Sequence, residues 1–480
     1  MRFPLLPLPR TAGPAWPAGL TAPAQVGAAV AVSAAGGLVL AAVGDWRLAL
    51  ALLAAALLVA VGMVRPALLV SAFVLLRPLL DDYSKVTVGG VPSANPGGAL
   101  GLLLLGGLAV VLGGAPKIFR PRATWPFVAV LAISAAAAAM ALTGFGGTIG
   151  AKPISELLRL AVLVAIYLLA ANLFTTPARV RQLFVLVALS AVLPAANGIY
   201  QWIQGVEPLP GYETGRITGT FAGPLPFSAY LAVAAVILIA LPREALRAWV
   251  RVPALAVILT ALVGTYSREG WVIFLLGVVL IHGRRRVGLV VTALVASVVV
   301  VAAVPTVRER VLPAESAKTQ GAGLESYDWR IGNWSGLLAQ WEERPLFGWG
   351  LTTTAYVNPR SKVESVGLPG GGHDAHHTGV RLLVEGGIVL LLAYIVLFVV
   401  LIGRLYRIQS ERWELRPFAR VVFWLWAVLL FIGLTTDDPL EETAMMYALL
   451  ALTGSVEGAR HRALEGESGP QAPLSERAER

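Results

Sequence analysis

Long apolar stretches recur along nearly the whole chain, and this pattern limits the fold more than any other feature of the sequence. Hydrophobic residues make up 57% of the 480 residues, whereas charged residues make up 14%. A soluble core could not bury so much apolar surface. Many of the stretches approach the roughly 20 residues that cross a bilayer as a helix. The sequence therefore predicts an all-α polytopic membrane protein, a helical bundle with 12–14 transmembrane helices.

We expect helices at fourteen apolar stretches, although several are shorter than a typical spanning helix. The third stretch contains Arg77 and Pro78, so the first three could form only two spans. The stretches lie near 26–44, 48–64, 66–80, 99–114, 125–143, 154–173, 182–204, 226–241, 252–266, 269–282, 287–304, 380–401, 421–435 and 443–456.

The charges of the connecting loops alternate along the chain. One set of loops is rich in arginine, as at Arg284–Arg286, and the other set carries acidic residues, as at Asp437–Asp438. Arginine and lysine in short loops favour the cytoplasmic side. This pattern predicts cytoplasmic termini and an outward-facing polar loop at 305–378. The net charge of +10 then comes from anchoring arginines, and we predict no nucleic-acid partner.

These features divide the chain into five parts. The N-terminus is too rich in proline for a cleavable signal peptide, so we expect the first span to stay as an anchor. The C-terminal end is polar and is predicted to be disordered. The parts are a Pro-rich cytoplasmic N-terminus (1–25), a transmembrane bundle (26–304), a large outward loop domain (305–378), C-terminal transmembrane helices (379–456) and a cytoplasmic tail (457–480).

A histidine cluster ends the outward loop. It comprises His373, His376 and His377, three of only five histidines in the chain. Their spacing beside Asp374 would allow metal binding, but the chain has no cysteine and no helical H-E-x-x-H motif, so we predict no metal site and no cofactor. They could also be inert loop residues. We favour a third interpretation, in which one imidazole, with an ordinary pKa of about 6.5, acts as a general base.

Three arginines lie in unusual outward segments. Arg216 stands in the glycine-flanked run RITGTF, where pairing with Glu213 is the alternative. Arg268 lies where two apolar spans meet with almost no loop, so it is a functional candidate unless it pairs with Glu269 or reaches toward lipid headgroups. Arg330 lies on a third segment, 328–341.

Segment 328–341 has the apolar spacing of an amphipathic helix, with Asp328 as its predicted N-cap and Arg330 on its apolar face. In the alternative interpretation this helix only lies on the membrane, with its tryptophans at the interface. That alternative does not explain the arginine. The apolar positions, at i, i+3, i+4 and i+7, are Trp334, Leu337, Leu338 and Trp341.

Four motifs occur in order around the outward loop: RITGTF, SREGW, DWRIGNW followed by RPLFGWG, and HHTGVRLLVEGG. In this order and in a membrane chain, they resemble the O-antigen ligase and O-antigen polymerase (Wzy-type) family. The resemblance covers roughly residues 200–400. Counted back from Glu385, the family's histidine falls on His376, and the position after it, usually asparagine, is His377 here.

The resemblance implies a GT-C-type glycosyltransferase of the bacterial inner membrane, with the active loop facing the periplasm or outside. Such enzymes move a glycan from undecaprenyl diphosphate to a hydroxyl of lipid A-core or of another lipid-linked glycan, with inversion and without a metal. By this resemblance Arg268, Arg330 and Arg216 bind the diphosphate, and His376 is the general base. The supporting residues are His377, His373 and Glu385. Membrane lipids are further expected partners.

Two other classes of protein remain open. A transporter or flippase would use intramembrane charges as a polar path. No matching halves of the kind common in transporters are visible. A non-catalytic scaffold would leave the arginine and histidine placement unexplained. The charges available for a transport path are Glu156, Arg159, Arg381 and Glu385.

Overall fold

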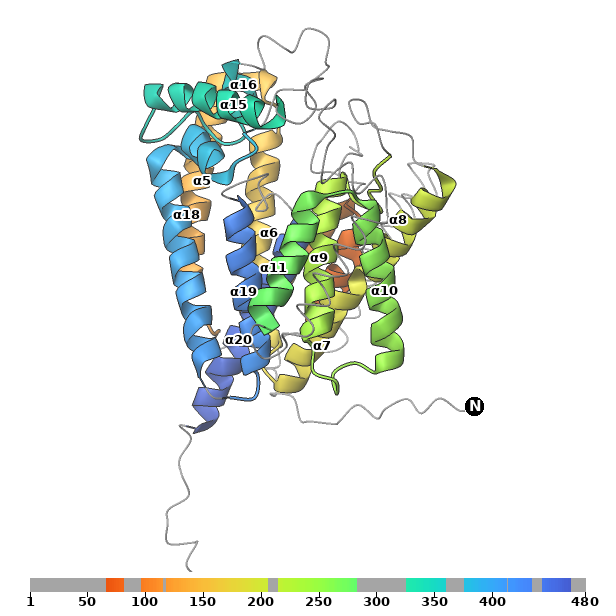
Figure 1. The fold of residues 1–480 in the computed structure, drawn as a ribbon. Helices are drawn as coiled ribbons and strands as arrows, with labels where there is room; N and C mark the ends of the chain where they lie inside the picture. Colours follow the sequence, from red (N-terminus) through yellow and green to blue (C-terminus); the bar gives the residue numbers. More distant parts are fainter. Residues whose placement is uncertain are drawn as a thin grey trace, which may run out of the picture.

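The computed structural model describes residues 66–81, 96–114, 118–205, 215–282, 325–359, 375–411, 413–433 and 443–467. Every regular element in these ranges is a helix (Figure 1). Five helical segments within them are long and apolar enough to cross a membrane, which confirms the predicted all-α membrane bundle. They are Thr124–Thr148, Lys152–Leu173, Pro177–Gln204, Thr378–Ser410 and Arg416–Gly433. The predicted helices in 1–65 and at 287–304, as well as His373, lie outside the described residues.

The elements keep the order of the apolar stretches in the sequence. They are α3 (Pro66–Leu76), η1 (Arg77–Leu79), α4 (Pro96–Gly114), α5 (Thr124–Phe145), η3 (Gly146–Thr148), α6 (Lys152–Leu173), α7 (Pro177–Ser190), α8 (Val192–Gln204), α9 (Pro224–Ala240), α10 (Ala248–Gly264), α11 (Arg268–His282), α15 (Glu325–Glu343), α16 (Thr354–Val357), α18 (Thr378–Ser410), α19 (Arg416–Gly433) and α20 (Thr443–Glu467).

Two helices form the interior of the bundle. Helix α9 is apolar on all sides and buried at every position from Phe227 to Leu238, as expected for a helix surrounded by others. Helix α20 packs closely on α6, because a Cβ at Gly454 or Gly458 would overlap the backbone of α6. Small residues at such contacts let two membrane helices approach closely.

Helix α20 also changes one predicted boundary. It continues to Glu467 and buries Val456, Glu457 and Ala459, whereas we assigned residues from 457 onward to a disordered tail. The polar composition of this segment favoured disorder, but its first turns pack against the bundle. Tertiary packing thus stabilises a helix in a segment whose polar composition predicted disorder.

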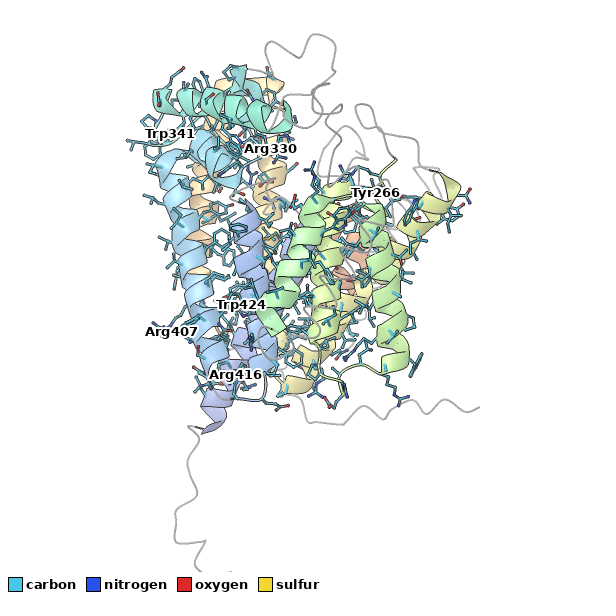
Figure 2. The ribbon with its side chains drawn as sticks, viewed as in Figure 1. Tyr266, Arg330, Trp341, Arg407, Arg416 and Trp424 are labelled. Carbon is cyan, nitrogen blue, oxygen red and sulfur yellow. The ribbon has the colours of Figure 1, made fainter. Side chains whose placement is uncertain are left out.

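Helix α15 lies across one end of the bundle, above α5 and α18 (Figure 1). Arg330 and Tyr266 lie toward this α15 end, whereas Arg407 and Arg416 lie toward the opposite end (Figure 2). The predicted apolar face of α15 is confirmed, because Leu337 is fully buried in a small core with Val380 of α18.

The predicted N-cap of α15 is wrong. The helix begins at Glu325, so Asp328 lies inside its first turn rather than before it. No proline or glycine separates Glu325 from Asp328, and the helix therefore extends by nearly one turn in the N-terminal direction.

Candidate functional site

Helix α18 is broken at Gly387, and a distant loop fills the break. Gly387 has φ 66° and ψ −166°, which interrupts the helical hydrogen bonds. The loop Pro345–Gly350 supplies hydrogen-bond partners for the backbone groups at this break. We call this loop, together with Val384–Val389 of α18, the clasp. In four backbone hydrogen bonds, Trp349 N–H donates to Val384 O (2.8 Å), Gly350 N–H to Glu385 O (2.9 Å), Ile388 N–H to Pro345 O (2.9 Å) and Val389 N–H to Leu346 O (3.3 Å). The clasp thus satisfies backbone groups that a broken helix would leave unpaired.

The clasp requires glycine at several of its positions. A Cβ at Gly387 would overlap Leu346 O, and a Cβ at Gly348 would overlap Val384 O. Both residues have positive φ, a conformation that side chains with a Cβ rarely adopt. Gly350 (φ 115°) lies against α5, where a Cβ would come 2.6 Å from Ala141 N. The motifs RPLFGWG and LLVEGG are therefore the two halves of one structural unit.

Glu385 joins this unit through its side chain. Its Oε1 accepts a 2.9 Å hydrogen bond from the hydroxyl of Thr354 in α16, and its side chain is buried. The same residue accepts from Gly350 through its carbonyl oxygen. Glu385 thus connects α18 to α16 and to the loop Pro345–Gly350.

His377 begins α18. Its Nδ1 accepts hydrogen bonds from the backbone N–H groups of Gly379 (3.0 Å) and Val380 (3.4 Å). Its backbone is extended, with φ −165° and ψ 114°, as is usual for an N-cap residue. Asparagine is among the preferred N-cap residues because its side-chain oxygen accepts the same bonds. The imidazole of His377 therefore provides the hydrogen-bond acceptor that an asparagine would provide at this position.

His376 precedes this cap in an unusual conformation. Its φ of 48° lies in the left-handed region, which costs energy for a residue with a side chain. Its side chain is half-buried. The residue before it, Ala375, is buried and accepts a 2.9 Å hydrogen bond from the indole of Trp334. The backbone around His376 is thus held on both sides, by Trp334 and by the cap at His377.

Arg330 lies on α15, which contacts this segment through Trp334. It lies four residues, about 6 Å along the axis, before Trp334, whose indole also meets the His377 ring edge-on at 5.1 Å between centroids. Arg330 is half-buried. A buried amide pair, Asn358 Nδ2 donating to Asn333 Oδ1 at 2.7 Å, fixes the same stretch of α15.

Arg216 lies in the segment before α9 and contacts the C-terminal end of α10. Its Nε donates a 2.9 Å hydrogen bond to Thr265 O, and the residue is 5% exposed. The following residues are held by Gln201 of α8, whose Oε1 accepts from the backbone N–H groups of Thr218 and Gly219. The predicted RITGTF loop is thus a braced segment against α8 and α10. Glu213, the alternative partner of Arg216, lies outside the described residues.

Arg268 is the first residue of α11, and its side chain is exposed. Ser267 precedes it, and its hydroxyl accepts from Gly270 N–H at 3.4 Å, which is the geometry of an N-cap. Only two residues, Tyr266 and Ser267, lie between Arg268 and Thr265, the partner of Arg216. These two arginines therefore share one region at the α15 end of the bundle, to which Tyr266 also belongs (Figure 2).

One comparison with known proteins identifies this part of the chain. The family model Wzy_C, described as O-antigen ligase, matches residues 253–395. Residues 253–395 are thus similar to the O-antigen ligase family, and we call this stretch the O-antigen ligase domain. No curated protein matches the chain. Of the predicted site residues, Arg216 alone lies before the O-antigen ligase domain.

A partly buried ion pair lies beside the O-antigen ligase domain. Arg159 and Glu156 form a two-bond ion pair within α6, with Nε donating to Oε2 at 2.7 Å and Nη2 bonded to Oε1. Arg381 of α18 is buried and lies close enough to Glu156 to interact electrostatically. Pairing of this kind lowers the cost of charges inside a membrane.

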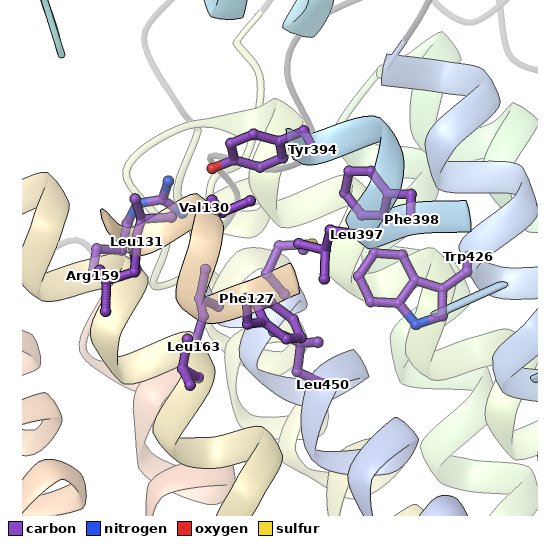
Figure 3. A pocket seen from close by; sticks show the side chains of 13 residues that line it. Phe127, Val130, Leu131, Arg159, Leu163, Tyr394, Leu397, Phe398, Trp426 and Leu450 are labelled. Carbon is purple, nitrogen blue, oxygen red and sulfur yellow. The ribbon is translucent and has the colours of Figure 1, made fainter. Parts of the chain in front are cut away.

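A pocket adjoins this ion pair. The side chains of Arg159 and Tyr394 lie at one end of it (Figure 3). Its remaining lining is apolar, for example Leu163 and Trp426. Cavities with such walls do not hold a chain of water molecules. Of the charges considered for a transport path, Arg159 thus borders an apolar space.

The sequence missed the residues that hold the O-antigen ligase domain together. Thr354, Asn333 and Asn358 act through contacts between distant segments, and no local pattern marks them. The break at Gly387 did have a signal, because the pair Gly386–Gly387 interrupts an otherwise apolar helix. Among the residues that the structure describes, no group of three or more His, Asp or Glu side chains could hold a metal ion.

Proposed function

We propose that this chain is a membrane glycosyltransferase that moves a glycan from undecaprenyl diphosphate to an acceptor hydroxyl. The observation that carries the proposal is the O-antigen ligase domain at residues 253–395. Arg330 lies toward the α15 end of the bundle, and so does Tyr266, which stands two residues before Arg268 (Figure 2). The acceptor is a lipid A-core or a second lipid-linked glycan.

In the proposed reaction, the acceptor oxygen attacks the anomeric carbon and the bond from that carbon to the diphosphate oxygen breaks. The electron pair leaves with the diphosphate, and the proton of the acceptor hydroxyl moves to His376. Attack opposite the leaving group inverts the anomeric centre. The diphosphate gains negative charge as it leaves, so catalysis needs positive charge at that position.

We assign this positive charge to Arg268 and Arg330, with Arg216 in support. A guanidinium group can donate two parallel hydrogen bonds to a phosphate. Arg268 also stands at the N-terminus of α11, where the backbone N–H groups favour an anion. Arg216 is bonded to Thr265 O, so its main effect is to brace the segment beside Arg268.

We assign the general base to His376 rather than His377. The Nδ1 of His377 accepts two backbone hydrogen bonds at the start of α18, and protonation of this atom would break the cap. His376 adopts a strained backbone conformation between two fixed neighbours. Strain of this kind gathers at functional sites, which supports the choice.

The test is transfer by purified protein in nanodiscs, with a lipid-linked glycan as donor and each acceptor class in turn. We expect His376→Ala to lower transfer by about 10²–10⁴-fold, the usual effect of losing a general base. Binding of the donor should persist, because the arginines remain. His377→Asn, which keeps a hydrogen-bond acceptor at the start of α18, and His373→Ala are the controls. A fully active His376→Ala would refute the assignment. Movement of lipid-linked glycan between leaflets without transfer would instead identify a flippase.

We further propose that the α15 end faces the outside of the cell, because arginine-rich loops favour the cytoplasmic side. The chain has no cysteine, so single cysteines give a clean test. Ser335 of α15 and Ser410 at the end of α18 are both exposed. In intact spheroplasts an impermeant thiol reagent should label Ser335→Cys but not Ser410→Cys. The reverse labelling would overturn this orientation.

A further inference from the structure

Two large apolar side chains project from the tip of the clasp. Leu346 is 58% exposed and Phe347 is 57% exposed. Their backbone is fixed, since Leu346 O accepts from Val389 N–H, and a Cβ at Gly387 would overlap the same carbonyl oxygen. The tip is therefore a rigid part of the molecule that presents an apolar surface.

Trp334, Trp341 and Trp349, which lie near the tip, donate their indole N–H groups to backbone carbonyl oxygens of the protein. Trp334 donates its indole N–H to Ala375 O, and Trp349 donates to Gln340 O. Trp341 donates to Pro345 O and belongs to the small core beneath α15. The indoles thus make intramolecular contacts, so the exposed apolar surface of the tip comes from Leu346 and Phe347 instead.

The position of the tip along α18 matches the thickness of a bilayer. About 20 residues of helix separate the break at Gly387 from Arg407, which at 1.5 Å per residue is roughly 30 Å, the thickness of the hydrocarbon core. Arg407 lies at the end of the bundle opposite α15 (Figure 2). Arginines near the ends of spanning helices lie at the membrane interface. If Arg407 lies at one boundary of the hydrocarbon, the clasp lies at the other.

The tip also continues an apolar stripe on α18. The exposed residues Leu392, Ile395, Val396 and Val399 recur at i, i+3, i+4 and i+7, so they form one face of the helix. Leu392 lies only three residues, about 4.5 Å along the axis, beyond Val389, the residue bonded to Leu346. A lipid-facing stripe of this kind therefore begins within one turn of the tip.

We propose that Leu346 and Phe347 insert into the bilayer at the boundary between hydrocarbon and headgroups, and that the partner of this surface is phospholipid. Exposed Arg344, stacked over Trp349 at 4.1 Å, stands beside them with its charge available to lipid phosphates. The insertion fixes the depth of the clasp, and through it the height of α15 and the start of α18. The inference does not depend on the glycosyltransferase proposal.

Depth-dependent fluorescence quenching tests the insertion. Phe347→Cys carries a bimane probe in phosphatidylcholine nanodiscs, and Ser335→Cys, exposed on α15, is the matched control. Leu346→Cys gives a second site in the tip. We expect lipids with a nitroxide near the carbonyl end of the acyl chain to quench the probes at 346 and 347 at least several-fold more than the probe at 335. Aqueous iodide should show the opposite order.

Two outcomes would overturn the inference. If iodide quenches the probes at 346 and 347 as strongly as the probe at 335, the tip lies in water. If neither quencher reaches the tip, another protein surface covers it, for example a second copy of the chain. Equal melting temperatures of labelled and native protein in detergent show that the fold is intact.

Discussion

The backbone N–H of Gly350 donates a 2.9 Å hydrogen bond to the carbonyl oxygen of Glu385, although the two residues belong to different motifs. The neighbouring bond from Trp349 to Val384 has the same direction. Together they hold the loop Pro345–Gly350 in the break of α18, about ten residues after the histidine segment. The two motifs therefore serve to position α15 and the start of α18. The proposed chemistry belongs instead to His376, Arg268 and Arg330.

Gly387→Ala should destabilise the protein and reduce transfer. The new Cβ would overlap Leu346 O and would need positive φ, which costs about 1–3 kcal/mol for a residue other than glycine. Gly403→Ala is the control on the same helix, because a Cβ there meets nothing within 4 Å. Thermal unfolding in detergent measures both. Equal midpoints for the two variants would show that the clasp does not stabilise α18.

His377→Asn should keep most activity, whereas His377→Ala should lose stability and activity together. Asparagine can accept hydrogen bonds from the first turn of α18, but alanine cannot, and loss of an N-cap costs about 0.5–2 kcal/mol. Melting temperature and transfer rate should be measured for both variants. A stable but inactive His377→Asn would mean that the imidazole has a chemical role, and the base would be reassigned to His377.

Arg268→Lys and Arg330→Lys should each lower transfer by about 10²-fold or more, since lysine keeps the charge but loses the planar fork. Arg268 is exposed, so its variant should melt at the native temperature.

Arg216→Ala should behave differently from the Arg268 variant. It loses the bond to Thr265 O, and both its melting temperature and its activity should fall. Thermal unfolding, measured beside a transfer assay, distinguishes an arginine that stabilises the fold from one that acts only in transfer. Near-native turnover of both lysine variants would remove the proposed diphosphate site.

Transfer should continue in excess EDTA. Within the described ranges no cluster of ligating side chains could hold a metal ion, and arginines are proposed to balance the charge of the diphosphate. The measurement is the initial rate of purified protein before and after chelation. Activity that disappears with EDTA and returns with Mg²⁺ or Mn²⁺ would contradict the prediction and renew interest in the histidine cluster as a metal site.

The sequence alone was enough to predict the membrane bundle, because the apolar stretches and the loop charges are local signals. It also predicted the apolar face of α15, since Trp334, Leu337 and Trp341 recur at helical spacing. The resemblance to O-antigen ligases rested on residue patterns in the same way, and the match at 253–395 confirms it. The catalytic roles stay predictions.

Only the tertiary structure decided which motif residues are structural. Three features depend on backbone groups that only the packed bundle brings into position. They are the break at Gly387, the N-cap at His377 and the contact of Arg216 with Thr265. In the sequence, only the count back from Glu385 in the family resemblance distinguished His376 from His377, since the two residues are identical in type. The difference arises because an N-cap side chain is recognised by where the backbone N–H groups of the following turn point, and only the folded helix determines that direction.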